Sequence, residues 1–395
     1  MPVLGISLYA YRQIILGVLL FTLIVDLRYK GFNNKILSNF VLLGLFWVAW
    51  GSASLFWAED STAALKDVAS VVFGFLPIFI FSALNAFDGK SITVFRTGWL
   101  LAFLFASSVA VWELTTGNHL PGAWVDNAPP HVLIFVVLST FGNPNNFAAF
   151  CVLVSSIFIV KLFSNITMKK RLFYFSLIGV TIIFSFIAGS RLSMASIPLL
   201  LLIMMAQKIP HKKVTFPILI IIGIVVSLII QPKLSVMDSG GSEYSQGIEK
   251  ISSEQVRINL AKVGMHFLFE TNFVGVGAGN FPYWTRHNRA PYHTFGMTNP
   301  HNYTIEIISQ YGLLVFMAFA AFFIGLGLVA IRGIKMANSI ADSELMENSQ
   351  YLIFGLGAYA LASVSNSAWI AAPYNILFLT YLTILAIYIS NKFYN

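Results

Sequence analysis

Long apolar runs separated by short polar breaks dominate the 395-residue chain. A helix needs about 20 apolar residues to cross the hydrocarbon core of a membrane. Runs of this length predict about eleven spans, near residues 13–27, 37–57, 67–85, 95–113, 145–164, 172–189, 192–206, 214–230, 313–331, 350–367 and 373–391. The run 131–140 is too short to span alone and fits a dip into the membrane or the start of a broken helix. The pattern predicts an all-α, polytopic transmembrane bundle of about 11–12 spans.

Composition supports a membrane protein, because 57% of the residues are hydrophobic and 10% are charged, whereas soluble domains carry about 25% charged residues. The net charge of +8 fits basic cytoplasmic loops. Since no basic stretch is interleaved with aromatic residues, we expect no nucleic-acid partner. The first apolar run lacks the features of a cleavable signal peptide. The single cysteine, Cys151, allows neither an internal disulfide nor a cysteine-based metal site.

Lysine and arginine residues collect in alternate loops, which the positive-inside rule places in the cytoplasm. The opposite side receives the segment 114–144 and a large loop, residues 231–312. We therefore expect three parts: transmembrane helices with short loops in 1–230, the loop 231–312 carrying the active site, and C-terminal transmembrane helices in 313–395. An odd number of spans puts the N-terminus outside, and one further span near the start would put it inside.

The polar chemistry of the chain is concentrated in residues 271–312. An amphipathic helix is predicted just before it, over 253–269, with Ser252 or Ser253 as N-cap and an apolar face formed by Val256, Leu260, Val263 and Phe267. A second short helix is predicted over 302–311, capped by Asn302. The glycines of the run 275–280 suit a tight turn and a close approach to a ligand or a neighbouring helix. Nucleotide binding is not expected there, because no strand precedes the run.

Three residues carry the main chemical hypothesis. Arg191 lies at a tight junction between two apolar segments, where it either snorkels to the interface or binds a phosphate. Arg257 also has two interpretations. It forms an ordinary helical ion pair with Glu254, or it binds an anionic ligand. His301 follows Pro300 where the loop returns to the membrane. It either hydrogen-bonds the backbone or removes a proton from a sugar hydroxyl.

Other polar residues are weaker candidates. Asn145 lies in the GNPNN sequence at 142–146, which also fits a capped helix start. The candidate substrate contacts are Arg286, Arg289, Asn302, Asn145 and Glu306, and weaker sugar contacts are Glu113, His119, Trp124 and Asp126. The histidines 287, 293 and 301 lack the spacing of a zinc site. We therefore expect no metal and no cofactor.

Four patterns resemble the O-antigen ligase and polysaccharide polymerase superfamily of bacterial envelopes. They are GNPNNFAAF at 142–150, AGSRLSMAS at 188–196, Arg257 ahead of FVGVGAGNF at 273–281, and NPHNYTIEIISQYGLLVF at 299–316. Their order and spacing agree, as does the large outer loop. The resemblance covers most of the chain from about residue 40 onward. Ligases of the superfamily usually have twelve spans, one more than the eleven predicted for this chain.

The resemblance implies inverting, metal-independent glycosyl transfer on the periplasmic or outer face of the cytoplasmic (inner) membrane. The implied donor is a glycan on undecaprenyl diphosphate. The arginines matching Arg191 and Arg257 would hold the diphosphate, and the histidine matching His301 would activate the acceptor hydroxyl. A polymerase would use another lipid-linked glycan as acceptor, whereas a ligase would use lipid A core. The motifs favour the polymerase narrowly. A lipid-linked glycan transporter is a third alternative, and the remaining expected partners are membrane lipid and a chain-length regulator.

Overall fold

The computed structural model describes residues 2–3, 6–7, 35–84, 89–120, 137–208, 253–287, 289–364 and 374–394. The chain divides into two compact units. Residues 1–92, 251–352 and 363–395 form the first unit, and residues 93–250 and 353–362 form the second.

Six helices in the described residues are long and apolar enough to cross a membrane, which confirms an all-α, polytopic membrane protein. They are Ser38–Phe56, Ile92–Thr116, Pro144–Leu162, Met168–Ile187, Tyr303–Ile340 and Asn375–Phe393. Each coincides with a predicted span. The predicted spans 13–27 and 214–230 lie outside the described residues, and the remaining three fall in helices that are not among these six. Two strands of two residues each, β1 (Pro2–Val3) and β2 (Ile6–Ser7), form an antiparallel pair near the N-terminus.

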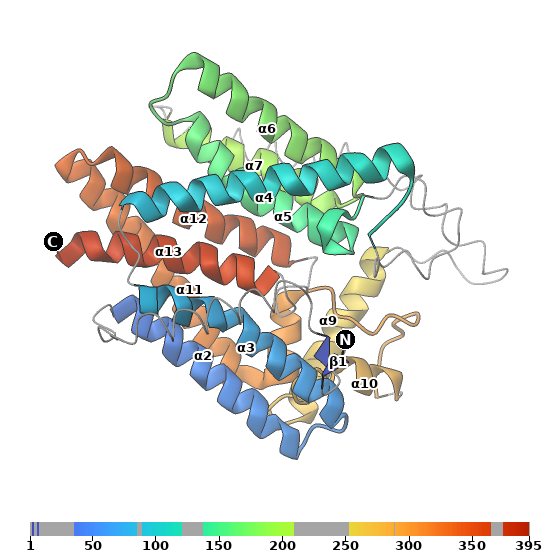
Figure 1. Ribbon diagram of the computed structural model, residues 1–395. Coiled ribbons are helices and arrows are strands. Elements are labelled where there is room, and N and C mark those ends of the chain that lie inside the picture. The colour runs from blue at the N-terminus through green and yellow to red at the C-terminus, as the bar shows by residue number, and fades with distance from the viewer. Residues whose placement is uncertain are drawn as a thin grey trace. The chain divides into compact units, whose positions relative to one another are not determined.

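The first unit is a group of apolar helices (Figure 1). Its helices are α2 (Lys35–Ala53), α3 (Ser61–Leu84), α9 (Ser253–Glu270), α10 (Phe281–Arg286), α11 (Tyr303–Ile340), the start of α12 (Ser343–Ser363) and α13 (Tyr374–Tyr394). Helix α2 packs on α3 and α11, α13 packs on α2, α3 and α11, and α9 packs on α11. Aromatic rings fill the centre, where Trp47 makes edge-to-face contacts with Tyr311 and Phe319 at centroid distances of 5.5 and 5.7 Å. Such ring pairs stabilise a core beyond the area they bury.

Helix α11 has 38 residues and is interrupted at Gly312, whose φ of 80° and ψ of −179° are not helical. The helix therefore has a short first part and a long apolar second part, as the sequence pattern predicts. Asn302 caps its start, because its side-chain oxygen accepts a hydrogen bond from the backbone N–H of Ile305 at 3.1 Å.

The second unit contains most of α4 (Gly89–Thr116), the 3-10 turn η4 (Ser139–Phe141), α5 (Pro144–Leu162), α6 (Met168–Ile187) and α7 (Arg191–Lys208). Helix α5 packs on α6 and α7, and its Cys151 is buried. Asn143 caps α5 by accepting a hydrogen bond from the backbone N–H of Asn145 at 2.9 Å, and Pro144 begins the helix. The capped helix start predicted from the GNPNN sequence is confirmed.

Glu113 has a structural role in the second unit. Its carboxylate accepts hydrogen bonds from the backbone N–H groups of Leu138 and Ser139, at 2.9 and 2.7 Å. It also contacts Nδ1 of His119 at 3.1 Å. Glu113 is only 2% exposed, and these hydrogen bonds fix the turn that precedes α5. Trp124 and Asp126 lie outside the described residues.

Candidate active site at the start of helix α11

Helix α9 supports the candidate site from one side. It runs over Ser253–Glu270, close to the predicted 253–269. Its apolar face packs into a cluster in which the buried residues are Leu260, Val263, Phe267, Val276, Phe281 and Trp284, with Val256 against it. The four-and-three spacing that predicted an amphipathic helix therefore also predicted its buried face.

Arg257 lies on the face of α9 that meets α11. Gly264 is seven residues further on and therefore on the same face. A Cβ added to Gly264 would come within 2.3 Å of the Ile305 side chain, so this face packs closely against the first turn of α11. The charge of Arg257 acts on His301, which lies just before that turn.

The surroundings of His301 favour the neutral form of its imidazole. Partial burial lowers the pKa of the imidazole below its usual value, and the positive charge of Arg257 lowers the pKa further. The backbone of His301 has a φ of 48°, in the left-handed region that costs a residue other than glycine about 1–2 kcal/mol. Its N–H donates to the side-chain oxygen of Asn299 at 2.8 Å. Strained residues of this kind cluster at functional sites.

The glycine-rich segment 273–280 completes the interrupted part of α11. An unbroken helix would direct the carbonyl oxygens of Ser309 and Gln310 to residues 313 and 314. These oxygens instead accept hydrogen bonds from the N–H groups of Val276 and Gly277, at 2.9 and 3.0 Å. The N–H of Leu313 donates in turn to the Phe273 carbonyl at 2.9 Å. The segment is thus bonded to α11 as a strand would be to its neighbour.

Only glycine fits at position 275. A Cβ on Gly275 would lie 2.6 Å from the Gln310 carbonyl oxygen. Of the two sequence-based interpretations of the glycine run, close approach to a neighbouring helix is the one the structure shows. Trp57 fixes the segment from the opposite side, donating its indole N–H to the Gly275 carbonyl at 3.0 Å. Asn280 accepts from the backbone N–H of Asp60 at 2.8 Å. The segment is therefore held between the turn after α2 and helix α11.

A buried polar group lies beneath the site. The Tyr311 hydroxyl donates to Asp67 at 2.5 Å, and the Gly279 N–H is a second donor to this carboxylate. Glu306 lies close enough for its charge to interact with that of Asp67. Oε2 of Glu306 and Oε1 of Gln310 are buried without a hydrogen-bond partner among the described residues. Glu306 is a candidate from the sequence, whereas Asp67 is not among the predicted residues, although an acidic residue in an apolar run is a signal of function.

The remaining candidate residues differ in what they contact. Arg289 binds Glu59 through both guanidinium nitrogens, at 2.5 and 3.1 Å, and lies over Trp284. The side-chain amide of Asn302 donates a hydrogen bond to the Val364 carbonyl at 3.2 Å. Asn302 also caps α11. Both residues hold the fold together. Arg286 ends α10 and is exposed.

The predicted catalytic residues are divided between the two units. His301 and Arg257 come together in the first unit. Arg191 begins α7 in the second unit, directly after a turn in which Gly189 has a φ of 68°. Asn145 lies in the first turn of α5 in the same unit. The predicted tight junction before Arg191 is confirmed.

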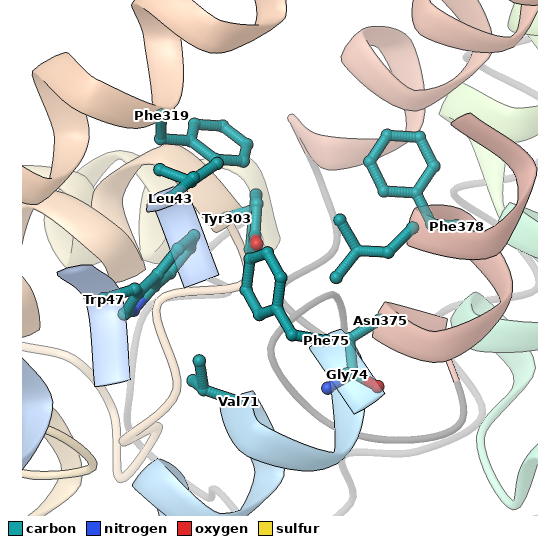
Figure 2. A pocket seen from close by; sticks show the side chains of 10 residues that line it. Leu43, Trp47, Val71, Gly74, Phe75, Tyr303, Phe319, Asn375 and Phe378 are labelled. Atoms are coloured by element: carbon teal, nitrogen blue, oxygen red, sulfur yellow. The ribbon is translucent and has the colours of Figure 1, made fainter. Parts of the chain in front are cut away.

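A mostly apolar pocket lies beside the start of α11, between α2, α3, α11 and α13 (Figure 2). It is lined by Leu43, Trp47, Val71, Gly74, Phe75, Tyr303, Phe319, Asn375, Phe378 and Leu379. Tyr303 follows His301 by two residues. The pocket therefore lies close in sequence to the candidate base, and its lining is mostly apolar.

We expect Gly312→Ala to lower the stability of the first unit by about 3 kcal/mol or more, because its backbone lies in a region open almost only to glycine. A Cβ would also lie 2.3 Å from the Val274 carbonyl oxygen. The thermal midpoint of the purified protein in detergent would measure this loss. Gly325→Ala in the same helix is the matched control, because nothing lies within 4 Å of the added Cβ. Equal midpoints for the two variants would contradict the role given to Gly312.

Two comparisons with known proteins bear on the family. Residues 175–320 match the family model described as O-Antigen ligase, a region that contains Arg191, Arg257 and His301. The chain is also 24% identical over 301 residues to the teichuronic acid biosynthesis protein TuaE of Bacillus subtilis (strain 168). This alignment covers 74% of the chain and 60% of the relative. Together with the membrane-spanning helices, the two matches confirm that the chain resembles the O-antigen ligase and polysaccharide polymerase superfamily of membrane glycosyltransferases.

Proposed function

We propose that the protein is an inverting, metal-independent glycosyltransferase that moves a glycan from undecaprenyl diphosphate to a sugar hydroxyl, as a polymerase of lipid-linked repeat units. The observation that carries the proposal is that the partly buried His301 imidazole, just before α11, lies within reach of the Arg257 charge. The relative is named for teichuronic acid biosynthesis, not for ligation to lipid A core. This name favours the polymerase over the ligase.

The proposed reaction uses the two kinds of side chain in different roles. Neutral His301 takes the proton of the acceptor hydroxyl while the hydroxyl oxygen bonds to the anomeric carbon. The bond between that carbon and the phosphate oxygen breaks, and its electron pair leaves on the diphosphate. Arg257 and Arg191 stabilise this negative charge through charge-assisted hydrogen bonds. Attack opposite the leaving group inverts the anomeric centre.

The apolar pocket supports a lipid-linked donor. Its lining is largely aromatic and aliphatic, and Tyr303 connects it to the segment that carries His301. Isoprene units that lie against this lining would remain in apolar surroundings. We assign the site to the outer face of the inner membrane, because the positive-inside rule places the short basic loops in the cytoplasm.

The test of the proposal is incubation of the purified full-length protein with a lipid-linked donor alone. We expect longer glycan chains on the lipid and release of undecaprenyl diphosphate. If product forms only after lipid A core is added, the protein is a ligase. Movement of donor across a vesicle membrane with its glycan–phosphate bond intact would instead identify a transporter and overturn the proposal.

We expect Arg257→Gln to shift the acid limb of the kcat/KM profile to higher pH. The base acts when neutral, so the rate falls as pH drops through the pKa of His301 in the free enzyme. Arg257 lowers this pKa, and its removal must raise it. Arg289→Gln is the control, because Arg289 binds Glu59. An acid limb that stays in place in Arg257→Gln would refute the electrostatic coupling.

We expect a chelator to leave the transfer rate unchanged. The proposed leaving group is stabilised by arginines, which replace the charge that a divalent ion supplies in metal-dependent transferases. The rate would be measured in the presence of EDTA and again after Mg²⁺ is restored. Loss of activity that Mg²⁺ reverses would show that the reaction depends on a metal.

A further inference from the structure

We propose that the polar face of α9 and residues 292–295 form a subsite for an acidic sugar of the glycan chain. The inference rests on the proposed function and names the class of saccharide that the enzyme handles. It concerns a part of the outer segment that the reaction described above does not use.

An exposed phenylalanine lies at the tip of a strained turn. The N–H of Met297 donates to the Thr294 carbonyl at 3.0 Å, and the two residues between them, Phe295 and Gly296, have φ values of 52° and 79°. Positive φ at both central positions strongly favours asparagine, aspartate or glycine. Phe295 is nevertheless present and is 38% exposed. The chain thus holds an aromatic ring towards the surroundings at a cost in backbone strain.

The turn is anchored on α9. Nδ1 of His293 accepts the N–H of Phe295 at 3.1 Å, and the two rings lie 4.3 Å apart. The carbonyl of His293 accepts a hydrogen bond from the side chain of Asn259 at 2.8 Å. The ring of Phe295 is therefore fixed in position rather than left on a loose loop.

A positive charge lies over the ring of Tyr292, the residue that precedes His293. Nζ of Lys262 is 5.3 Å from the centroid of the Tyr292 ring, and Lys262 shares a face of α9 with Asn259, three residues earlier. The acidic residue at the end of this helix, Glu270, is paired with His266 at 3.3 Å. A sugar ring can place its C–H face on an aromatic ring, whose face is negative, while its carboxylate meets the ammonium group.

The subsite is separate from the reacting centre. Lys262 lies on the side of α9 opposite Gly264 and Arg257, since residues two apart on a helix are about 200° apart. Six residues of chain connect Phe295 to His301, which limits their separation to about 21 Å. The subsite would therefore hold a sugar at most a few units from the one that reacts. Contact at a distance from the reacting bond suits an enzyme that extends a chain.

Binding of two probes to the purified full-length protein tests the inference. The probes are an oligosaccharide that contains glucuronic acid and a neutral glucose oligosaccharide of equal length, with Kd measured by calorimetry. We expect the wild type to bind the acidic probe about fivefold more tightly, the upper range for one exposed ion pair. Lys262→Met should remove this preference, and Lys262→Arg should keep it. Lys335→Met, near the C-terminal end of α11, is the control and should keep the preference for the acidic probe.

Phe295→Gly separates binding from folding. It removes the ring and also the strain, so we expect weaker binding of both probes, by about fivefold, at a thermal midpoint equal to or above that of the wild type. Phe269→Ala is the control. It removes an exposed ring on α9, outside the subsite, and should leave Kd unchanged. Equal affinity of the wild type for the two probes, absence of binding, or unchanged Kd in Phe295→Gly would overturn the subsite. If lipid-linked donor is still polymerised in that case, the proposed function stands without it.

Discussion

Replacing His301 with alanine is expected to lower the rate of glycan transfer by about 10²–10⁴-fold, the usual contribution of a general base. The imidazole of His301 is partly buried, and burial together with Arg257 lowers its pKa, so that it is ready to accept a proton. Single-turnover transfer with a lipid-linked donor is the appropriate measurement, because it isolates the chemical step from product release.

The backbone at His301 makes a second variant necessary. Its φ of 48° strains alanine, whereas asparagine, like histidine, enters this region more readily. His301→Asn should therefore fold at least as well as His301→Ala and be equally inactive. His287→Ala removes an exposed imidazole that stacks on Tyr283 and should retain activity. Transfer near the wild-type rate in both His301 variants, with the proteins folded and inserted, would eliminate this residue as the base.

Replacing Arg191 with alanine is expected to lower kcat by about 10²–10³-fold, the effect of removing one preset donor from a developing anion. The residue follows the tight turn at Gly189 and starts α7, so its position is set by two helices. Lysine at this position keeps the charge but loses the planar fork that matches a phosphate. Arg191→Lys should therefore fall between alanine and the wild type.

The measurement for Arg191 is kcat together with inhibition by free undecaprenyl diphosphate. Weaker inhibition in Arg191→Ala would link the residue to the diphosphate rather than to the acceptor. Arg332→Ala provides the control, since Arg332 is an exposed cation near the C-terminal end of α11. A fully active Arg191→Ala variant, or one equal to Arg332→Ala, would remove Arg191 from the site.

Local features of the fold could be predicted from the sequence because they depend on neighbouring residues. The buried face of α9 follows from the spacing of Leu260, Val263 and Phe267. The caps at Asn143 and Asn302 follow from an amide directly before a helical run. Hydropathy alone identified each of the six spans, because lipid requires long apolar helices.

Pairings between distant parts of the chain were not predictable. Tyr311 meets Asp67 across 244 positions, and Arg289 meets Glu59 across 230 positions. Neither periodicity nor capping contains information on such pairs. For this reason Arg289 was a candidate substrate contact in the sequence and is an ion-pair partner in the structure. The sequence also leaves open whether the glycine run approaches a ligand or a neighbouring helix. The hydrogen bonds to the carbonyl groups near Gly312 show that it approaches helix α11.

The central claim is that two arginines and one histidine act on a single diphosphate-linked sugar. A structure of the full-length protein with bound undecaprenyl diphosphate tests it most directly. The account predicts phosphate oxygens within about 3 Å of the guanidinium groups of both Arg191 and Arg257, with the His301 imidazole facing the same cavity. A diphosphate bound elsewhere, or Arg191 on a surface separate from Arg257 and His301, would contradict it.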